Sequence, residues 1–295
     1  MPFDTAYEAI SEDTDTGHRW AFGTGFTDPL AGVDTAVPAG VDGADLAAYC
    51  LMLGDDALIM SHRLQQWLAR APELEEDTAL ANIALDLLGQ ARLLLTRAGA
   101  ADGSGRSEDD YAFARGEREF RNVRLAEVID TDFAGLLARL LVFSTWRLAL
   151  LTRLRSSVDP VLAAVAAQGV KELTYHRDYA AEWVIRLGDG TDYSRERMQA
   201  GLAAVAPLIP ELFETSAIER RLMAVGLAPD PAEVRAEFDA VVSHVVDAAT
   251  LDVPAVPGLA GVGGQAGRDG VHTEAMGYLV AELQSVARSM PGATW

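Results

Sequence analysis

The chain has 295 residues, of which 49% are hydrophobic, and a formal net charge of −20 at pH 7. This length suffices for one large domain or two small ones with a sizeable core. The negative charge argues against binding to nucleic acid or anionic membranes, because both require a basic face. The single cysteine, Cys50, excludes an intrachain disulfide framework and a cysteine-rich metal site. No apolar run of about 18 residues and no signal-peptide pattern is found, so we expect a cytoplasmic protein.

Residues 1–43 are predicted to be an acidic extension outside the folded domain. They contain eight acidic residues against one arginine, many Gly, Thr and Pro residues, and no sustained hydrophobic periodicity. Three aromatic residues stand out among them: Trp20, Phe22 and Phe26. Two roles are considered for their side chains, docking on a partner and hydrophobic contact with the chain's own body. The folded domain is predicted to cover residues 44–295.

Four long helices are predicted in the first part of this domain. Apolar residues recur at spacings of three and four in residues 44–69, 73–98, 132–154 and 159–187. A very short Ala-Pro turn between the first two implies an antiparallel pair. Asp159 and Pro160 fit the N-cap and first position of the fourth helix. The sequence therefore predicts an all-α bundle.

The remaining segments are predicted to be further helices, loops and an arm. Additional helices are expected at residues 194–214, 218–225, 231–251 and 273–289. Pro207 and Pro210 should kink or split the first of these. Between the second and third long helices we expect a loop, a short helix at residues 108–115 and a solvated stretch at 116–124. Residues 252–270, rich in Pro and Gly, are expected to be an irregular arm.

The second long helix has a pattern close to that of a metal-binding helix. Carboxylate-bridged di-iron bundles direct a Glu-x-x-His pair toward the core from each of two helices. Leu87 and Gln90 occupy the corresponding positions here, and none of the five histidines follows a Glu-x-x-His pattern. Residues 133–152 of the third helix contain no Asp or Glu, so one helix offers no carboxylate ligand. The pattern predicts a bundle helix that has lost its ligands.

One histidine lies on the core stripe of the fourth helix. His176 follows Glu172 by one helical turn, a spacing that allows an intrahelical hydrogen bond or ion pair. We prefer to interpret His176 as a core histidine with a satisfied hydrogen bond. A metal site built from His176, Glu172 and Asp86 is the alternative.

Other metal and nucleotide patterns occur in unsuitable places. Asp-x-x-His is found twice, as Asp15 with His18 in the acidic extension and as Asp269 with His272 in the arm. Residues 261–266 spell Gly-x-Gly-x-x-Ala, but no predicted strand precedes them, so a chance match is preferred over a dinucleotide site.

Further candidate groups have ordinary structural interpretations. Asp55 and Asp56 could act as an acid–base pair, although helix-face solvation or a buried hydrogen bond is preferred. Cys50 lacks a histidine partner and is expected to be a buried small apolar residue. Thr273 and Glu274 are expected to cap the last helix and to favour its dipole.

Several long motifs resemble one protein family. They are residues 71–92, 171–176, 188–192, 270–274 and 291–295. These stretches closely resemble the structural C subunits of phenylacetyl-CoA epoxidase, also called phenylacetate-CoA oxygenase, and the similarity extends over about residues 45–295. The resemblance implies a ferritin-like four-helix bundle with additional C-terminal helices.

The catalytic A subunits of that complex are homologous ferritin-like chains. They read Asp-Glu-Ala-Gly-His where residues 86–90 here read Asp-Leu-Leu-Gly-Gln, and Glu-Glu-Ser-Phe-His where residues 172–176 read Glu-Leu-Thr-Tyr-His. By this resemblance both bridging glutamates are leucine here and only one histidine is kept. The degenerate di-iron positions are then Leu87, Gln90, Leu173 and His176.

The resemblance implies a non-catalytic scaffold in an NADPH-dependent monooxygenase that forms the ring 1,2-epoxide of phenylacetyl-CoA. It implies no catalytic, cofactor or metal residue on this chain, a di-iron centre in the partner A subunit, and FAD and iron–sulfur groups in a reductase. An acyl-CoA-recognition module is a further hypothesis, but no basic cluster suited to the CoA phosphates stands out in the sequence.

Overall fold

The computed structural model describes residues 30–291 and 293. The chain divides into two compact units, Met1–Gly32 and Val33–Trp295. In the first unit only residues 30–32, which form a turn, are described. The helical fold belongs to the second unit.

The second unit includes residues that the sequence assigns to the acidic extension. Arg97 donates hydrogen bonds to the backbone carbonyls of Thr35 and Ala36, and the side chain of Asp42 caps the first long helix. Residues 33–43 therefore belong with the helical body, and the chain divides earlier than the boundary expected at residue 43. The aromatic residues of the extension lie outside the described residues: Trp20, Phe22 and Phe26.

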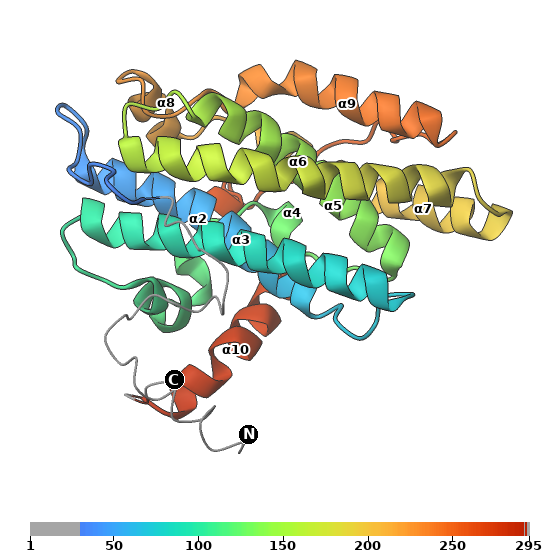
Figure 1. Cartoon of the computed structure of the whole chain (residues 1–295), viewed down its shortest axis with the longest axis horizontal. Helices are drawn as coiled ribbons and strands as arrows, with labels where there is room; N and C mark the ends of the chain where they lie inside the picture. Colours follow the sequence, from blue (N-terminus) through green and yellow to red (C-terminus); the bar gives the residue numbers. More distant parts are fainter. Residues whose placement is uncertain (1–29, 292, 294–295) are drawn as a thin grey trace, which may run out of the picture. The chain divides into compact units, whose positions relative to one another are not determined.

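Four long helices form the bundle (Figure 1): α2 (Gly43–Gln65), α3 (Leu74–Ala101), α5 (Phe133–Leu154) and α6 (Pro160–Gly188). α2 packs along α3, α5 packs along α6, and α3 also contacts α6. The side chains of Asp42, Asp132 and Asp159 accept hydrogen bonds from first-turn N–H groups of α2, α5 and α6, which fixes where these helices begin. The predicted all-α, ferritin-like architecture is confirmed.

α5 is the most deeply buried of the four helices. Trp146 on its inner face is almost fully buried, and its Nε1 donates to the carbonyl oxygen of Leu212 at 2.9 Å. By length and composition, α3 and α5 are each long and apolar enough to cross a membrane. The bent pair formed by Asp192–Leu208 and Pro210–Met223 also meets these criteria when its two segments are taken together. These findings correct the expectation that no such apolar run exists. The apolar window of α5 is 94% buried inside the protein and that of α3 is 44% buried. The hydrophobicity of α5 is thus used in the core.

The segment between α3 and α5 is folded onto the bundle. It contains a π-helical turn, η1 (Asp110–Ala114), a 3-10 turn, η2 (Glu117–Glu119), and the short α4 (Arg124–Glu127). Phe120 and Val123 are buried, and so are Arg115 and Arg124, because each guanidinium pairs with a buried carboxylate. The expectation of a solvated stretch at residues 116–124 therefore holds for the exposed residues 117–119 and is wrong for residues 120–124, most of which are buried.

The C-terminal part adds shorter elements around the bundle: α7 (Asp192–Val205), η3 (Ala206–Leu208), η4 (Pro210–Phe213), α8 (Ala217–Met223), η5 (Pro231–Val234), α9 (Arg235–Ala248), η6 (Gly267–Asp269) and α10 (Glu274–Ser289). The prolines at 207 and 210 split the predicted helix into α7 and two 3-10 turns, as expected. In Figure 1, α7 and α9 lie along the bundle, whereas α10 projects away from it. Within residues 30–291, β structure is confined to one bridge between Val262 and Gln265 in the irregular arm.

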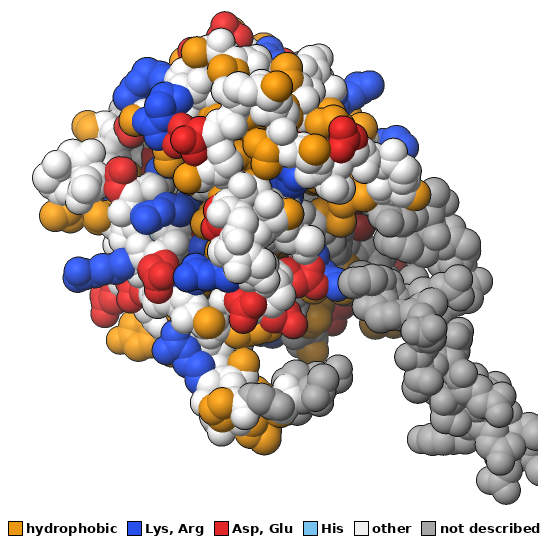
Figure 2. Space-filling view, turned by 90° about the vertical axis from the view of Figure 1, so that its left-hand side faces the viewer, with side chains coloured by type: hydrophobic (Ala, Val, Ile, Leu, Met, Phe, Trp, Pro, Cys, Tyr) orange, Lys and Arg blue, Asp and Glu red, His pale blue; other side chains and the backbone are white. Residues whose placement is uncertain are grey.

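Acidic and basic side chains are intermixed on one face of the molecule. Figure 2 shows the face at the left of Figure 1, where Lys and Arg side chains alternate with Asp and Glu. The described part of this face has no uniform basic area of the kind that a nucleic-acid backbone requires.

Candidate functional site

The four degenerate di-iron positions lie in the interior between α3 and α6. Leu87 and Gln90 are separated by three residues and share one face of α3, as Leu173 and His176 do on α6. The two leucines and His176 are fully buried, and Gln90 is 3% exposed. The structure thus places the four predicted positions in one buried region, and apolar side chains occupy the two at which the resemblance implies bridging carboxylates in the catalytic subunits.

The polar groups around these leucines are held in pairs. Nε2 of Gln90 donates to Oε2 of Glu172 at 2.8 Å, and Nε2 of Gln168 donates to Oε1 of the same carboxylate at 2.7 Å. A distance of 2.9 Å separates Nε2 of His176 from Oδ2 of Asp86. These contacts join α3 to α6 at two levels. The expectation of a satisfied core histidine is therefore met at one ring nitrogen only: Nε2 has Asp86 as its partner, and the buried Nδ1 has no hydrogen-bond partner among the described residues.

The alternative metal site does not assemble. The ligand atoms of His176, Glu172 and Asp86 do not all come within 4.8 Å of one another, as the donors around one ion would. Among the described residues, that condition is met by one group, Glu73, Glu75 and Glu76 at the start of α3, which is largely exposed. An exposed acidic cluster at a helix N-terminus is accounted for by the helix dipole.

Arg147 on α5 also points into this interior, and sequence reasoning missed it. Its Nε donates to Oε1 of Gln90 at 3.1 Å, and its Nη1 donates to the carbonyl oxygen of Leu53 on α2 at 3.1 Å. Burial lowers the pKa of the guanidinium to about 10, and the negative charges of Asp56 and Glu172 oppose this shift. Arg147 is therefore still a cation at neutral pH.

These residues do not fit a di-iron centre. Such a centre needs hard carboxylate oxygens and two imidazoles that converge from four helices. Here α5 has no acidic residue, Leu87 and Leu173 replace the bridging ligands, and Arg147 places a positive charge beside Gln90. A metal cation at these positions would meet too few oxygen donors and a like charge.

Asp55 and Asp56, the candidate acid–base pair on α2, are fully buried and engaged in ion pairs. Asp55 pairs with Arg115 and also accepts from the backbone N–H of Arg121 at 2.8 Å. Asp56 pairs with Arg268 at 2.9 Å and accepts from the backbone N–H of Val123 at 2.8 Å. Each carboxylate has several donors, so the preferred interpretation as buried hydrogen-bonded groups is confirmed.

A second buried polar cluster fastens the start of α10. Glu127 lies 2.7 Å from Nδ1 of His272 and accepts a hydrogen bond from Asn122 at 2.9 Å. Burial disfavours the charged imidazole, but the hydrogen bond and negative charge of Glu127 outweigh it, so the pKa of His272 is raised above its usual value. Asp269 instead accepts from the backbone N–H of Ala266, so the Asp-x-x-His spelling at 269–272 is not a ligand pair.

The other predicted features have structural roles. Residues 261–266 form the turn around the Val262–Gln265 bridge, with no strand or helix of a dinucleotide fold beside them. Cys50 is fully buried, and burial raises the pKa of its thiol. Thr273 stands at the N-cap of α10, but its hydroxyl makes no capping hydrogen bond, which corrects that detail. The Asp15–His18 spelling lies outside the described residues.

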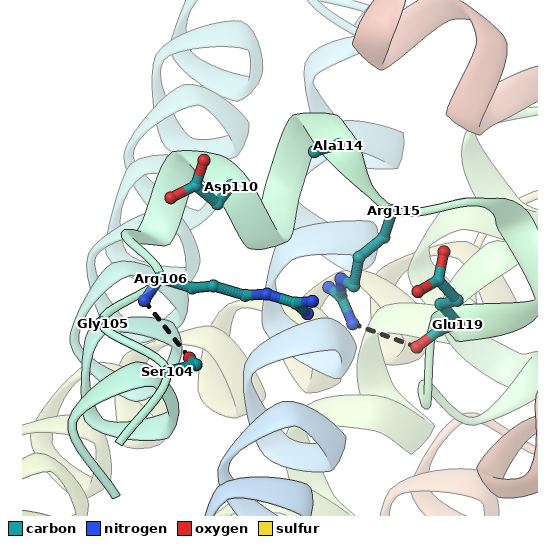
Figure 3. A pocket seen from close by; sticks show the side chains of 7 residues that line it. All are labelled: Ser104, Gly105, Arg106, Asp110, Ala114, Arg115 and Glu119. Atoms are coloured by element: carbon teal, nitrogen blue, oxygen red, sulfur yellow. Dashed lines mark hydrogen bonds between the residues drawn. The ribbon is translucent and has the colours of Figure 1, made fainter. Parts of the chain in front are cut away.

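Two surface cavities lie away from the degenerate positions. One of about 320 Å³ is lined by seven residues between Ser104 and Glu119, and Figure 3 shows Arg106 and Arg115 extending into it. Arg115 is already committed to Asp55 and to the carbonyl oxygen of Glu119. The other, of about 850 Å³, lies between η1 and the end of α10. None of the four degenerate positions lines either cavity.

The fold and the interior together define a class: a ferritin-like helical bundle whose interior between α3 and α6 holds buried leucines, a histidine and an arginine. The chain belongs to the family of phenylacetic acid catabolic proteins, whose sequence model matches residues 34–295. It is 43% identical over 250 residues to the C subunit of the 1,2-phenylacetyl-CoA epoxidase of Escherichia coli (strain K12). That similarity covers 85% of this chain and 99% of the relative. The resemblance noted from the sequence is confirmed.

Proposed function

We propose that this chain is the non-catalytic structural subunit of a cytoplasmic phenylacetyl-CoA epoxidase and that it pairs with the di-iron catalytic subunit of the same complex. The observation that carries the proposal is the interior between α3 and α6, where Leu87 and Leu173 are fully buried. In this proposal the partner holds the iron, and a separate reductase with FAD and iron–sulfur groups supplies electrons from NADPH.

The proposed pairing is supported by two further observations. The relative is named as one subunit of an epoxidase, so related chains act in an assembly. Large apolar side chains are also exposed on the outer sides of α3 and α6, namely Leu74, Leu85 and Tyr175. Exposed apolar surface on neighbouring helices is suited to burial against a second helical protein.

The physical role of such a subunit is to cover an apolar face of the catalytic bundle and to hold its helices in position. The chain's own interior supports this role, because hydrogen bonds and an ion pair connect all four long helices. A bundle fixed in this way is a stiff support for a neighbour.

The test is reconstitution of the complex with variants of this chain. We expect co-expression with the catalytic subunit to give one species in size-exclusion chromatography, with iron confined to the partner. His176→Gln and Glu172→Gln in this chain should leave turnover within about threefold of the parent complex. Losses of about 100-fold or more, the scale at which catalytic groups act, would assign the chemistry to this chain and refute the proposal.

The two other hypotheses are separated by direct binding measurements. Stoichiometric iron in the purified chain would support a metal site at His176, Glu172 and Asp86. Calorimetric binding of an acyl-CoA to the isolated chain would support a recognition module. We expect neither, because the three metal candidates do not converge and Arg115 in the cavity of Figure 3 is already paired.

A further inference from the structure

One buried guanidinium connects all four long helices. Arg147 of α5 is fully buried and donates to the Leu53 carbonyl of α2 and to Gln90 of α3, both at 3.1 Å. Gln90 in turn donates to Glu172 of α6 at 2.8 Å. Hydrogen bonds from Arg147 therefore connect α5 directly to α2 and α3, and they connect it to α6 through the side-chain amide of Gln90.

The charges that face this guanidinium come from three elements. Asp56 approaches from α2, Glu172 from α6 and Arg268 from η6. The hydroxyl of Tyr49 on α2 is neutral, because burial raises its pKa. Asp56 is already matched by Arg268, which pairs with it at 2.9 Å. Glu172 receives hydrogen bonds from two neutral amides, those of Gln90 and Gln168. Arg147 thus lies in the field of Asp56 and, less strongly, of Glu172, and its hydrogen-bonded path to Glu172 runs through the amide of Gln90.

In metal-containing bundles of this architecture, a metal cation at the centre balances inward-facing carboxylates and ties the helices together. We propose that the guanidinium of Arg147 takes the place of that cation: it supplies the positive charge at the centre of this bundle and keeps a divalent metal out. The inference deepens the proposed function and rests on it in one respect, namely that this chain has no metal centre of its own.

The exclusion has a simple physical basis. A guanidinium has no lone pair to offer a metal, and it stays charged at neutral pH. Its repulsion of a dication is strong in a dry interior, where the effective dielectric constant is low. Its Nε also holds the Oε1 of Gln90, the side chain at one of the former ligand positions. Restoring ligand residues alone should therefore not restore a metal site.

The first test separates charge from packing. Arg147→Met removes the cation, Arg147→Lys keeps it, and Arg153→Met on the same helix breaks a partly exposed pair with Glu237 as the control. Thermal unfolding of the full chain is measured at pH 5 and pH 8. We expect Arg147→Met to lose more stability at pH 8 than at pH 5, because removal of the cation disfavours the ionised form of the buried carboxylates, so the folded variant holds protons more tightly. Arg147→Lys should recover at least half of that loss.

The control should change the melting temperature by no more than about 2 °C at either pH, as partly exposed ion pairs contribute little. Equal losses for Arg147→Met and Arg147→Lys, the same at both pH values, would show that Arg147 acts only through packing and hydrogen bonds. That result would overturn the proposal.

The second test addresses metal exclusion with cobalt(II) as the probe. Leu87→Glu, Gln90→His and Leu173→Glu are combined, with Arg147 either kept or changed to Met, and folding is checked by circular dichroism. In equilibrium dialysis we expect at least tenfold tighter cobalt binding without Arg147. Equal affinity would overturn the exclusion and leave the proposed function intact. Stoichiometric cobalt in the unchanged chain would instead refute the proposed function. If these variants do not fold, the pH comparison decides the proposal.

Discussion

Replacing Leu87 by glutamate tests directly whether the interior of this bundle has become apolar. Leu87 is fully buried on α3, and glutamate has a similar volume, so the cavity contribution is small. The variant loses the burial of a leucine, about 1.5–3 kcal/mol. It also gains a buried carboxyl group without a dedicated partner, which costs about 1–3 kcal/mol even when neutral. We expect Leu87→Glu to lower the free energy of unfolding by about 3–5 kcal/mol.

The loss should depend on pH in a defined direction. Burial disfavours the charged form of the introduced carboxyl group, so its pKa in the folded state rises above the value of about 4.3 in the unfolded chain. The folded state then binds the proton more tightly, and stability falls as pH rises above the unfolded pKa. Leu87→Glu should therefore be less stable at pH 8 than at pH 5.5, relative to the parent at the same pH.

Urea unfolding followed by circular dichroism measures both effects. Leu85→Glu on the same helix is the matched control, because Leu85 is 43% exposed and its substitution should change stability by less than about 1 kcal/mol. A loss for Leu87→Glu as small as that of the control would refute the apolar interior. The same conclusion would follow if ferrous iron raised the melting temperature of the Leu87→Glu, Leu173→Glu double variant above that of the parent.

Two further predictions concern the edges of the bundle. Deletion of residues 1–32 should leave the melting temperature within about 2 °C of the parent. Deletion of residues 1–43 should lower it by about 4–8 °C, because Arg97 loses its backbone acceptors and α2 loses its N-cap. Similar melting curves for the two deletions would contradict this boundary. The raised pKa of His272 means that its pairing with Glu127 stabilises the fold below about pH 6.5 and that this contribution is lost as pH rises through the folded pKa. The melting-temperature gap between the parent and His272→Gln should therefore be wider at pH 6 than at pH 8, and an equal gap would argue against a charged imidazole.

The long helices were predictable because their signals are local. Apolar spacing defines the buried face, and an Asp-Pro pair at 159–160 marks the start of α6. The stretch at 116–124 was not predictable in the same way. Its arginine neighbours are buried because their partners are Asp55, 60 residues before Arg115, and Glu211, 87 residues after Arg124. No local pattern shows that a charge 60 or more residues away neutralises a given arginine.

The candidate site could likewise be predicted only in part from the sequence. The assignment of Leu87 and Leu173 to the positions of bridging ligands was available from the sequence, because it is what the resemblance to the catalytic A subunits implies. The role of Arg147 does not, because an arginine in an apolar helix reads equally well as one whose stem is buried and whose charged end reaches solvent. Its apolar neighbours in α5 are the one available signal, and the structure shows that the charge stays inside.

The pairing of Asp56 with Arg268 has a consequence for how the chain is made. The two residues are 212 positions apart, and the Asp56 side chain is fully buried while that of Arg268 is largely so. Until residue 268 has been synthesised, Asp56 on α2 lacks its ion-pair partner, and burial of a carboxylate that has lost its partner is strongly destabilising. The N-terminal hairpin therefore gains its full stability only when the C-terminal part of the chain is present. Completion of the core waits for the last tenth of the chain, and a product truncated before Arg268 would remain a substrate for chaperones and proteases.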